Sequence, residues 1–208
     1  MIYVFDLDGT LIDSELRHGV LIKRILGNAG ISTDGDFLNK YLEKKRMGKN
    51  SKMILLEEFI IDEEAADTLV GEWIEGIEND EMLLYDKLYF DSLDTLKRIK
   101  ESSQNIYFLS LRNRKDAAVS ELKRLGIYDY ATDLYIGATE LGELYKAKKL
   151  TELKTIDEVI MIGDTEIDYE ASKMAGVSSY IVSRGFRNEE FLNTNSIKSF
   201  MDLTHIIV

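Results

Sequence analysis

Short apolar runs without polar alternation constrain this chain more than any other feature of its sequence. Four runs are clear and a fifth is weaker: residues 2–5, 106–109, 159–162 and 180–182, with 134–136 as the weaker one. Such runs are typical of strands buried on both faces of a parallel sheet. The segments between them repeat apolar residues at helical spacing, and three end in glycine plus a β-branched residue, at 30–31, 126–127 and 176–177. Alternating strands and helices predict a parallel α/β sheet.

One region interrupts this alternation. From residue 14 to residue 84 no segment has the pattern of a strand, and helical periodicity covers 16–29, 37–45, 51–61 and 63–78. We therefore predict an α/β fold with a doubly wound, Rossmann-like parallel sheet core and an inserted α-helical cap. The core would be residues 1–14 and 85–208, discontinuous in the chain, and the helical cap domain residues 15–84.

The amino-acid composition excludes several classes of functional site. The 208 residues include no cysteine and two histidines, which excludes disulfides, zinc-thiolate sites and a thiol nucleophile and disfavours a multi-histidine metal site. Acidic residues outnumber basic ones by 38 to 26. Because a nucleic-acid binder needs a basic face, this balance argues against a general nucleic-acid-binding protein. The opening apolar run stops at Asp6, and no segment resembles a membrane span or a secretory leader. We expect a soluble cytoplasmic protein.

The first predicted strand ends in Asp6-Leu7-Asp8-Gly9-Thr10. Two carboxylates directly after a buried strand are unfavourable unless a cation lies between them. Mg²⁺, which prefers oxygen ligands, is the natural candidate. The alternative is a polar turn, because Asp-Gly is common in turns.

A second acidic pair, Asp164 and Asp168, follows the strand at 159–162 and opens a helix. Ligands of open α/β sheets bind at the carboxyl ends of the strands, so we expect Asp6, Asp8 and this pair to converge around one metal ion. Alternatively, Asp164 or Thr165 caps the helix, a role that can coexist with metal binding.

Three further polar residues could reach the same crevice. Ser110 ends the strand at 106–109 and could donate a hydrogen bond to a phosphoryl oxygen, although a serine in a turn is the alternative. Arg112 could add a phosphate contact or pair at the surface. Lys146 could neutralise a phosphate oxygen or be a surface lysine, with Lys148 or Lys149 as competitors for the role.

Taken in order, Asp6-Leu7-Asp8-Gly9-Thr10, Ser110, Lys146, and Gly163-Asp164 with Asp168 resemble the four motifs of the haloacid dehalogenase superfamily. The resemblance covers roughly residues 1–14 and 85–208. The predicted helical insertion lies where phosphatases of this superfamily carry a cap, and the whole resembles a phosphatase of the phosphoglycolate-phosphatase or phosphomutase type. The family usually has Lys-Pro where this chain has Lys146 followed by alanine.

The resemblance implies phosphoryl transfer through an aspartyl phosphate. Asp6 would be the nucleophile, and Asp8 the general acid and then the general base. Mg²⁺ would be held by Asp6, the backbone carbonyl of Asp8 and Asp164, while Asp168 would orient the water shell of the metal or Lys146. The dehalogenases of the superfamily lack a second acid, so Asp8 favours phosphoryl transfer over carbon–halogen cleavage.

Ser110 and Lys146 would hold the equatorial phosphoryl oxygens, with Arg112 as a further candidate. The cap would select the substrate. Its basic stretch at 44–50 contains Arg46 and Lys49, which could clamp a second anionic group or form a solvated charge run at a helix end.

Two residues just after the first motif, Arg17 and His18, could also face the site, whereas the apolar spacing around Trp73 indicates the core of the cap.

Four functions remain open. The first is a Mg²⁺-dependent phosphohydrolase of a small phosphorylated metabolite, and the second a phosphomutase that resembles β-phosphoglucomutase. The third is a phospho-accepting switch, which the large insertion disfavours, and the fourth a non-catalytic protein on the same fold. We expect a small phosphorylated substrate as partner, no nucleic acid or membrane, and a monomer or homodimer.

Overall fold

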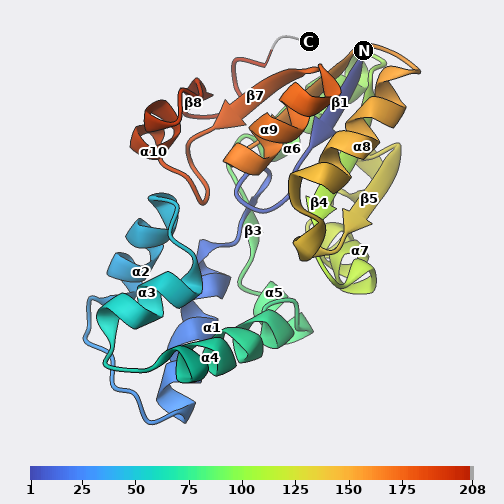
Figure 1. The fold of residues 1–208 in the computed structure, drawn as a ribbon. Helices are drawn as coiled ribbons and strands as arrows, with labels where there is room; N and C mark the ends of the chain where they lie inside the picture. Colours follow the sequence, from blue (N-terminus) through green and yellow to red (C-terminus); the bar gives the residue numbers. More distant parts are fainter. Residues whose placement is uncertain (207–208) are drawn as a thin grey trace.

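A computed structural model describes residues 1–206 of the chain. Its centre is a six-stranded sheet in the order β5-β4-β1-β6-β7-β8, and every neighbouring pair is parallel (Figure 1). The strands are β1 (Ile2–Phe5), β4 (Asn105–Leu111), β5 (Asp133–Gly137), β6 (Val159–Gly163), β7 (Ser178–Val182) and β8 (Ser199–Phe200). All five predicted strands are confirmed. The two residues of β8 are too few to produce a recognisable pattern.

Helices cover both faces of this sheet. They are α6 (Ser92–Glu101), α7 (Lys115–Arg124), α8 (Gly142–Lys154), α9 (Glu166–Ala175) and α10 (Glu189–Thr194), with short 3₁₀ helices at Tyr128–Tyr130 and Thr139–Leu141. Apolar side chains of α6 and α7 pack on one face with Tyr3 and Phe5 of β1. Those of α8 and α9 pack on the other face with Ile2 and Val4. Burial on both faces explains the unbroken apolar pattern of β1 and confirms the doubly wound α/β fold.

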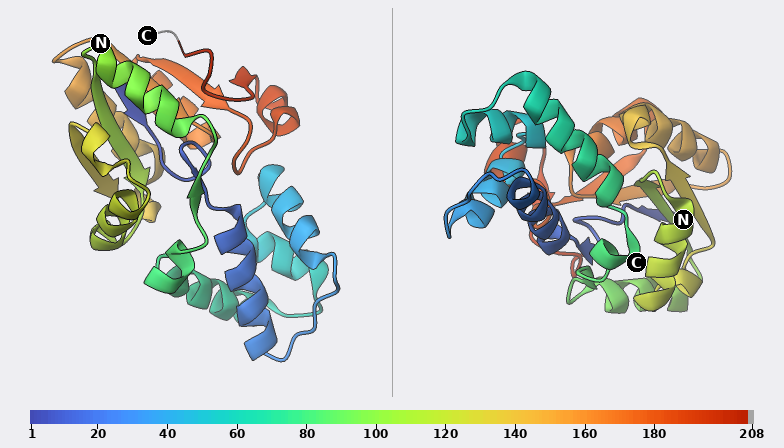
Figure 2. Two further views of the ribbon diagram at one scale, coloured as in Figure 1. Left: turned by 180° about the vertical axis from the view of Figure 1, so that it is seen from behind. Right: turned by 90° about the horizontal axis from the view of Figure 1, so that it is seen from below.

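The chain between the first strand and α6 forms a separate group of helices at the carboxyl end of the sheet (Figure 1 and Figure 2). These are α1 (Glu15–Asn28), α2 (Phe37–Arg46), α3 (Ser51–Glu58), α4 (Glu63–Gly76) and α5 (Asp80–Leu83). The hydrophobic cluster that holds them together draws all its members from residues 20–85. The four predicted helices are confirmed, and α5 is an additional single turn.

The two connections between this helical group and the sheet run side by side. They pair as an antiparallel ribbon of β2 (Ile12–Asp13) and β3 (Lys87–Leu88). The group is thereby fixed beside the ends of β1 and β4. None of the helices within residues 1–206 combines the length and apolar character needed to cross a membrane.

Candidate active site

Asp6 and Asp8 follow β1 directly, and the structure places their carboxylates in two different clusters of charge. The acid cluster comprises Asp6, Asp164, Asp168 and Lys146. The arginine cluster comprises Asp8, Arg17, Asp86, Arg112 and Glu121.

The turn after Asp8 brings β1 and β6 close together at the site. Gly9 has a φ of 75°, and a Cβ atom there would lie 2.1 Å from Oδ2 of Asp164. Glycine is therefore required at this position both for the left-handed backbone and for space.

The acid cluster is buried and compact. Asp6, Asp164 and Asp168 each offer one carboxylate oxygen, and these oxygens all lie within 4.8 Å of one another. Lys146 of α8 places its Nζ 3.1 Å from Oδ1 of Asp6 and 2.6 Å from Oδ1 of Asp168. The structure thus brings Lys146 to this cluster, while Lys148 is exposed.

Three carboxylates and one ammonium leave this cluster with an excess of negative charge. Burial raises the pKa of Asp164 well above its usual value, and the charges of Asp168 and Asp6 raise it further. Burial also raises the pKa of Asp6, although Lys146 opposes the shift. Oδ1 of Asp6 is buried and accepts no hydrogen bond of good geometry, although the ammonium of Lys146 lies 3.1 Å from it. Converging carboxylate oxygens with an excess of negative charge fit a hard divalent cation such as Mg²⁺.

Two neighbouring groups fix the orientation of these carboxylates. The N–H of Phe186 donates to Oδ2 of Asp164 at 2.8 Å. Asp168 accepts from the N–H and the hydroxyl of Thr165 at the start of α9, at 3.2 and 2.9 Å. Thr165, rather than Asp164, therefore stands at the helix cap, and Asp164 is left facing the cluster.

The arginine cluster surrounds Asp8. Arg112 donates to both carboxylate oxygens of Asp8, from Nε at 2.8 Å and NH2 at 2.9 Å, and Arg17 of α1 donates to Oδ1 at 2.5 Å. Burial by itself would raise the pKa of Asp8, but Arg112 and Arg17 outweigh burial and lower it below its usual range.

Each arginine also faces a second carboxylate. Arg112 bonds to Glu121 of α7 at 2.5 Å, and Nε of Arg17 lies 3.4 Å from Asp86. Arg112 is only 3% exposed, so the surface-pairing alternative for it is wrong. Burial raises the pKa of Asp86; Arg17 opposes this shift, and Asp8 and Glu121 add to it.

Of the other predicted site residues, Ser110 lies at the sheet end that carries both clusters, whereas Arg46 and Lys49 form ion pairs within the helical group. Ser110 is buried near the end of β4, which pairs with β1. Arg46 instead pairs with Glu15, and Lys49 pairs with Glu57. In the structure both side chains pair with acidic residues of the helical group, and neither belongs to the acid cluster or the arginine cluster.

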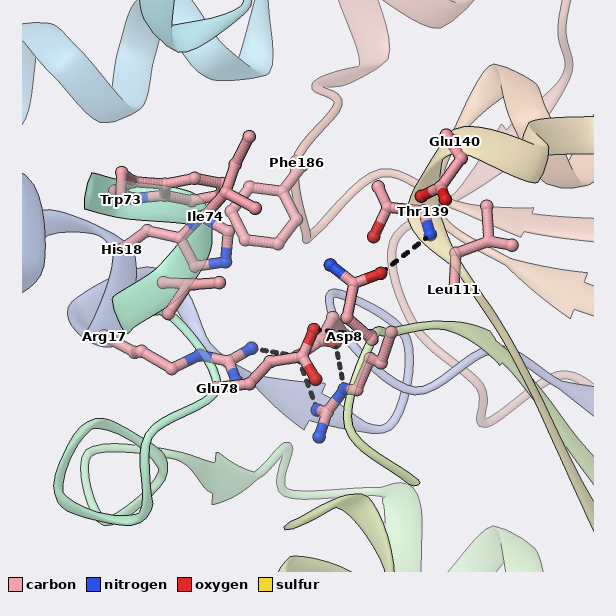
Figure 3. Close-up of a pocket in the computed structure, with 13 residues that line it drawn as sticks. Asp8, Arg17, His18, Trp73, Ile74, Glu78, Leu111, Thr139, Glu140 and Phe186 are labelled. Atoms are coloured by element: carbon pink, nitrogen blue, oxygen red, sulfur yellow. Dashed lines mark hydrogen bonds and ion pairs between the residues drawn. The ribbon is translucent and has the colours of Figure 1, made fainter. Parts of the chain in front are cut away.

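A cavity of about 450 Å³ opens next to Asp8, between the helical group and the edge of the sheet (Figure 3). Its lining residues are Asp8, Arg17, His18, Trp73, Ile74, Ile77, Glu78, Leu111, Arg112, Asn113, Thr139, Glu140 and Phe186. Trp73 packs against the cluster of the helical group, as predicted, but it also lines this cavity.

Sequence reasoning missed Phe186, Asp86 and Glu121. Phe186 follows β7 at the same sheet edge as the predicted acids, so the strand-end rule could have found it. Asp86 and Glu121 carry no such signal, because an acid near a chain connection or on a helix resembles a solvated surface residue.

The sequence model of the haloacid dehalogenase-like hydrolases matches residues 1–176. The phosphoglycolate phosphatase of Aquifex aeolicus (strain VF5) is 26% identical over 196 residues, which cover 89% of this chain and 85% of that protein. A hydrolase of the haloacid dehalogenase-like family from Streptococcus pneumoniae has a similar solved structure, with a TM-score of 0.72, 20% identity and coverage of 95% and 91% of the two chains. A predicted phosphatase from Clostridium acetobutylicum gives a TM-score of 0.73 at 19% identity, with coverage of 97% and 93%.

Proposed function

Because this chain belongs to the haloacid dehalogenase-like hydrolase family, we propose that it is a cytoplasmic phosphatase of small phosphorylated metabolites that works through an aspartyl phosphate on Asp6. The similarity to a phosphoglycolate phosphatase supports the reaction class. The observation that carries the proposal is the position of Asp6. Its buried carboxylate lies 3.1 Å from the ammonium of Lys146, and Asp8, two residues on, lines a cavity.

In the first half-reaction, a carboxylate oxygen of Asp6 forms a bond to phosphorus as the bond to the leaving alcohol oxygen breaks. Asp8 donates a proton to that oxygen, and the alcohol departs. In the second half-reaction, Asp8 takes a proton from water as the water oxygen bonds to phosphorus. The bond between Asp6 and phosphorus then breaks, which releases inorganic phosphate. Arg17 and Arg112 favour the ionised Asp8 that this second half needs. The first half therefore requires Asp8 to take up a proton against this bias before the alcohol departs.

Mg²⁺ would be held by Asp6 and Asp164 with the backbone carbonyl of Asp8. When bound, the ion supplies positive charge that screens the repulsion between the nucleophile and the phosphoryl group. Ser110 and Lys146 would hold the phosphoryl oxygens. Asp168 would orient Lys146, which it contacts at 2.6 Å.

Arg112 was predicted to bind phosphate, but it is bonded to Asp8 and Glu121. We propose that Arg112 orients Asp8. The helical group, residues 15–84, would act as a cap domain on a core of 1–14 and 85–208, because its own hydrophobic cluster gives it an independent interior.

The test is release of inorganic phosphate from a panel of phosphomonoesters, with Mg²⁺ and with EDTA. We expect Mg²⁺-dependent release by the native chain and a loss of at least about 1,000-fold in Asp6→Asn, because an amide cannot replace the proposed carboxylate nucleophile. Asp94→Asn is the matched control, since the Asp94 side chain is 82% exposed on α6. Equal activity in Asp6→Asn would contradict the proposal. Transfer of the phosphoryl group to an added alcohol rather than to water would indicate the mutase alternative.

A further inference from the structure

The position of the cavity relative to the two clusters assigns it to the leaving group. Asp8, the proposed acid for the leaving oxygen, lines the cavity, whereas the four residues of the acid cluster do not. A phosphoryl group at Asp6 would thus have its ester oxygen beside Asp8 and the rest of the alcohol in the cavity. This step rests on the proposed function.

One wall of the cavity is aromatic. His18 of α1 lies 4.4 Å from the ring of Phe186 and 5.1 Å from the ring of Trp73 on α4, between ring centroids (Figure 3). Burial lowers the pKa of His18 well below its usual value, and the charges of Arg17 and Lys45 lower it further, so this imidazole is neutral. Ile74, beside Trp73 in Figure 3, extends the apolar wall.

The charges that line the cavity disfavour a second anionic group on the substrate. Among the residues that line it, three carboxylates, those of Asp8, Glu78 and Glu140, outnumber two guanidinium groups. Both guanidinium groups, of Arg17 and Arg112, already face Asp8.

Two cations of the basic stretch at 44–50 are engaged outside the cavity. Arg46 pairs with Glu15 and Lys49 pairs with Glu57, and neither lines the cavity. A carboxylate or second phosphate on the alcohol would therefore face lining carboxylates that outnumber the guanidinium groups. Lys45, whose ammonium lies 5.4 Å from the centroid of the Trp73 ring, does not line the cavity.

We propose that the substrate is a phosphomonoester whose alcohol carries an uncharged aromatic or similarly planar body, which Trp73, His18 and Phe186 hold by ring contacts. A volume of about 450 Å³ accommodates such a body. Aromatic rings pair favourably edge to face or offset, beyond the burial of their area. Trp73, His18 and Phe186 are then residues that determine specificity. A short dianionic ester such as phosphoglycolate would fill neither the volume nor the wall.

Binding can be followed directly, because Trp73 is the only tryptophan of the chain. The native protein with Mg²⁺ would be titrated with benzylphosphonate and with phosphonoacetate, which carries a carboxylate in place of the ring. We expect benzylphosphonate to change the Trp73 fluorescence with a Kd at least about tenfold below that of phosphonoacetate. Tighter or equal binding of phosphonoacetate, or no effect of benzylphosphonate, would overturn the inference.

Turnover supplies the second readout. Benzyl phosphate, ethyl phosphate and phosphoglycolate are all esters of primary alcohols, which limits differences in leaving-group reactivity. We expect kcat/KM of the native protein to be highest for benzyl phosphate. Trp73→Ala should lower kcat/KM for benzyl phosphate by at least about tenfold more than it lowers kcat/KM for ethyl phosphate. Trp73→Phe, which keeps an aromatic ring, should retain most of the native activity on benzyl phosphate. Phe90→Ala, which removes an exposed aromatic ring outside the helical group, is the control.

The two proposals fail in different ways. If Asp6→Asn abolishes phosphate release and phosphoglycolate is nevertheless the best substrate, the proposed function stands and the aromatic assignment is wrong. If no ester gives release that depends on Asp6, the proposed function itself fails, whatever the fluorescence titration shows.

Discussion

The acid cluster and the arginine cluster form around two aspartates, Asp6 and Asp8, that lie two residues apart at the end of β1. Their electrostatic environments shift carboxyl pKa values in opposite directions. Around Asp6, three buried carboxylates share one ammonium, so burial and repulsion raise the pKa values of Asp6 and Asp164. Around Asp8, two guanidinium groups bind three carboxylates through direct ion pairs, and the pKa of Asp8 is lowered.

The difference teaches that a buried acidic pair in sequence need not form one site. The acid cluster keeps an excess of negative charge after its single ammonium is counted, and this excess fits a divalent cation. The arginine cluster is nearly neutral within itself and links three parts of the chain: the strand end, α1 of the helical group and α7 of the core. We therefore expect changes in the acid cluster to affect binding and catalysis, and loss of an arginine from the arginine cluster to affect stability as well as the orientation of Asp8.

The largest effect should follow removal of the central cation of the arginine cluster. Arg112→Met would leave Asp8 and Glu121 without their shared partner, and we expect the free energy of unfolding to fall by about 3–5 kcal/mol. Urea denaturation followed by circular dichroism measures it. Arg114→Met, at a partly exposed arginine on the same loop, is the matched control and should change stability far less. A small effect of Arg112→Met would mean that the cluster does not stabilise the fold.

For the acid cluster we expect a large effect on metal binding and catalysis and little effect on stability. Asp164→Asn should weaken Mg²⁺ binding and lower kcat at least about 100-fold, because a charged ligand is lost. The same change should leave the free energy of unfolding unchanged or raise it, since it relieves repulsion by Asp6 and Asp168.

Calorimetric titration with Mg²⁺ and urea denaturation without metal test the two parts separately. Asp133→Asn, at an exposed aspartate of β5, serves as control. Marked destabilisation of Asp164→Asn in the absence of metal would break the contrast between the two clusters.

The smallest effect, counted per pH unit, concerns the pH dependence of stability at Asp86. Burial raises the pKa of this carboxyl in the folded state, with Asp8 and Glu121 adding to the shift against Arg17. Above about pH 4 the unfolded chain has lost this proton while the folded chain keeps it, so stability falls as pH rises. Asp86→Asn removes the titration. Relative to the native chain, the variant should gain about 1.4 kcal/mol for each pH unit between pH 5 and pH 8 over which Asp86 stays protonated.

Thermal unfolding at several pH values, with Asp94→Asn alongside, provides the measurement. A difference between Asp86→Asn and the native chain that stays constant with pH would show that Asp86 is ionised in the folded state.

Much of the fold was predictable because its central strands are buried on both faces and several of its helices end in a recognisable glycine pattern. The runs at 2–5 and 159–162 are continuous in hydrophobicity, as parallel central strands must be. Gly30, Gly126 and Gly176 adopt positive φ, as the helix-end pattern predicted. The two-residue strands β2, β3 and β8 carry no period and could not be predicted.

The cap illustrates the opposite case. The basic stretch at 44–50 lies at the end of α2, as expected, but the sequence does not show which anionic group each basic side chain contacts. In the structure, Arg46 pairs with Glu15 and Lys49 pairs with Glu57. The wall of the cavity depends on how α4 and the loop after β7 approach α1, and the sequence contains no local signal for that approach.

What the sequence by itself determined is the edge of the sheet at which the chemistry lies. Parallel strands end on one side, so Asp6, Ser110 and Asp164 had to meet there whatever the details of packing. Only the tertiary structure decided that Asp8 turns to Arg17 and Arg112 while Asp6 turns to Lys146. The direction of a side chain and the identity of its charged partner depend on contacts between residues distant in the chain, and these leave no periodic trace in the sequence.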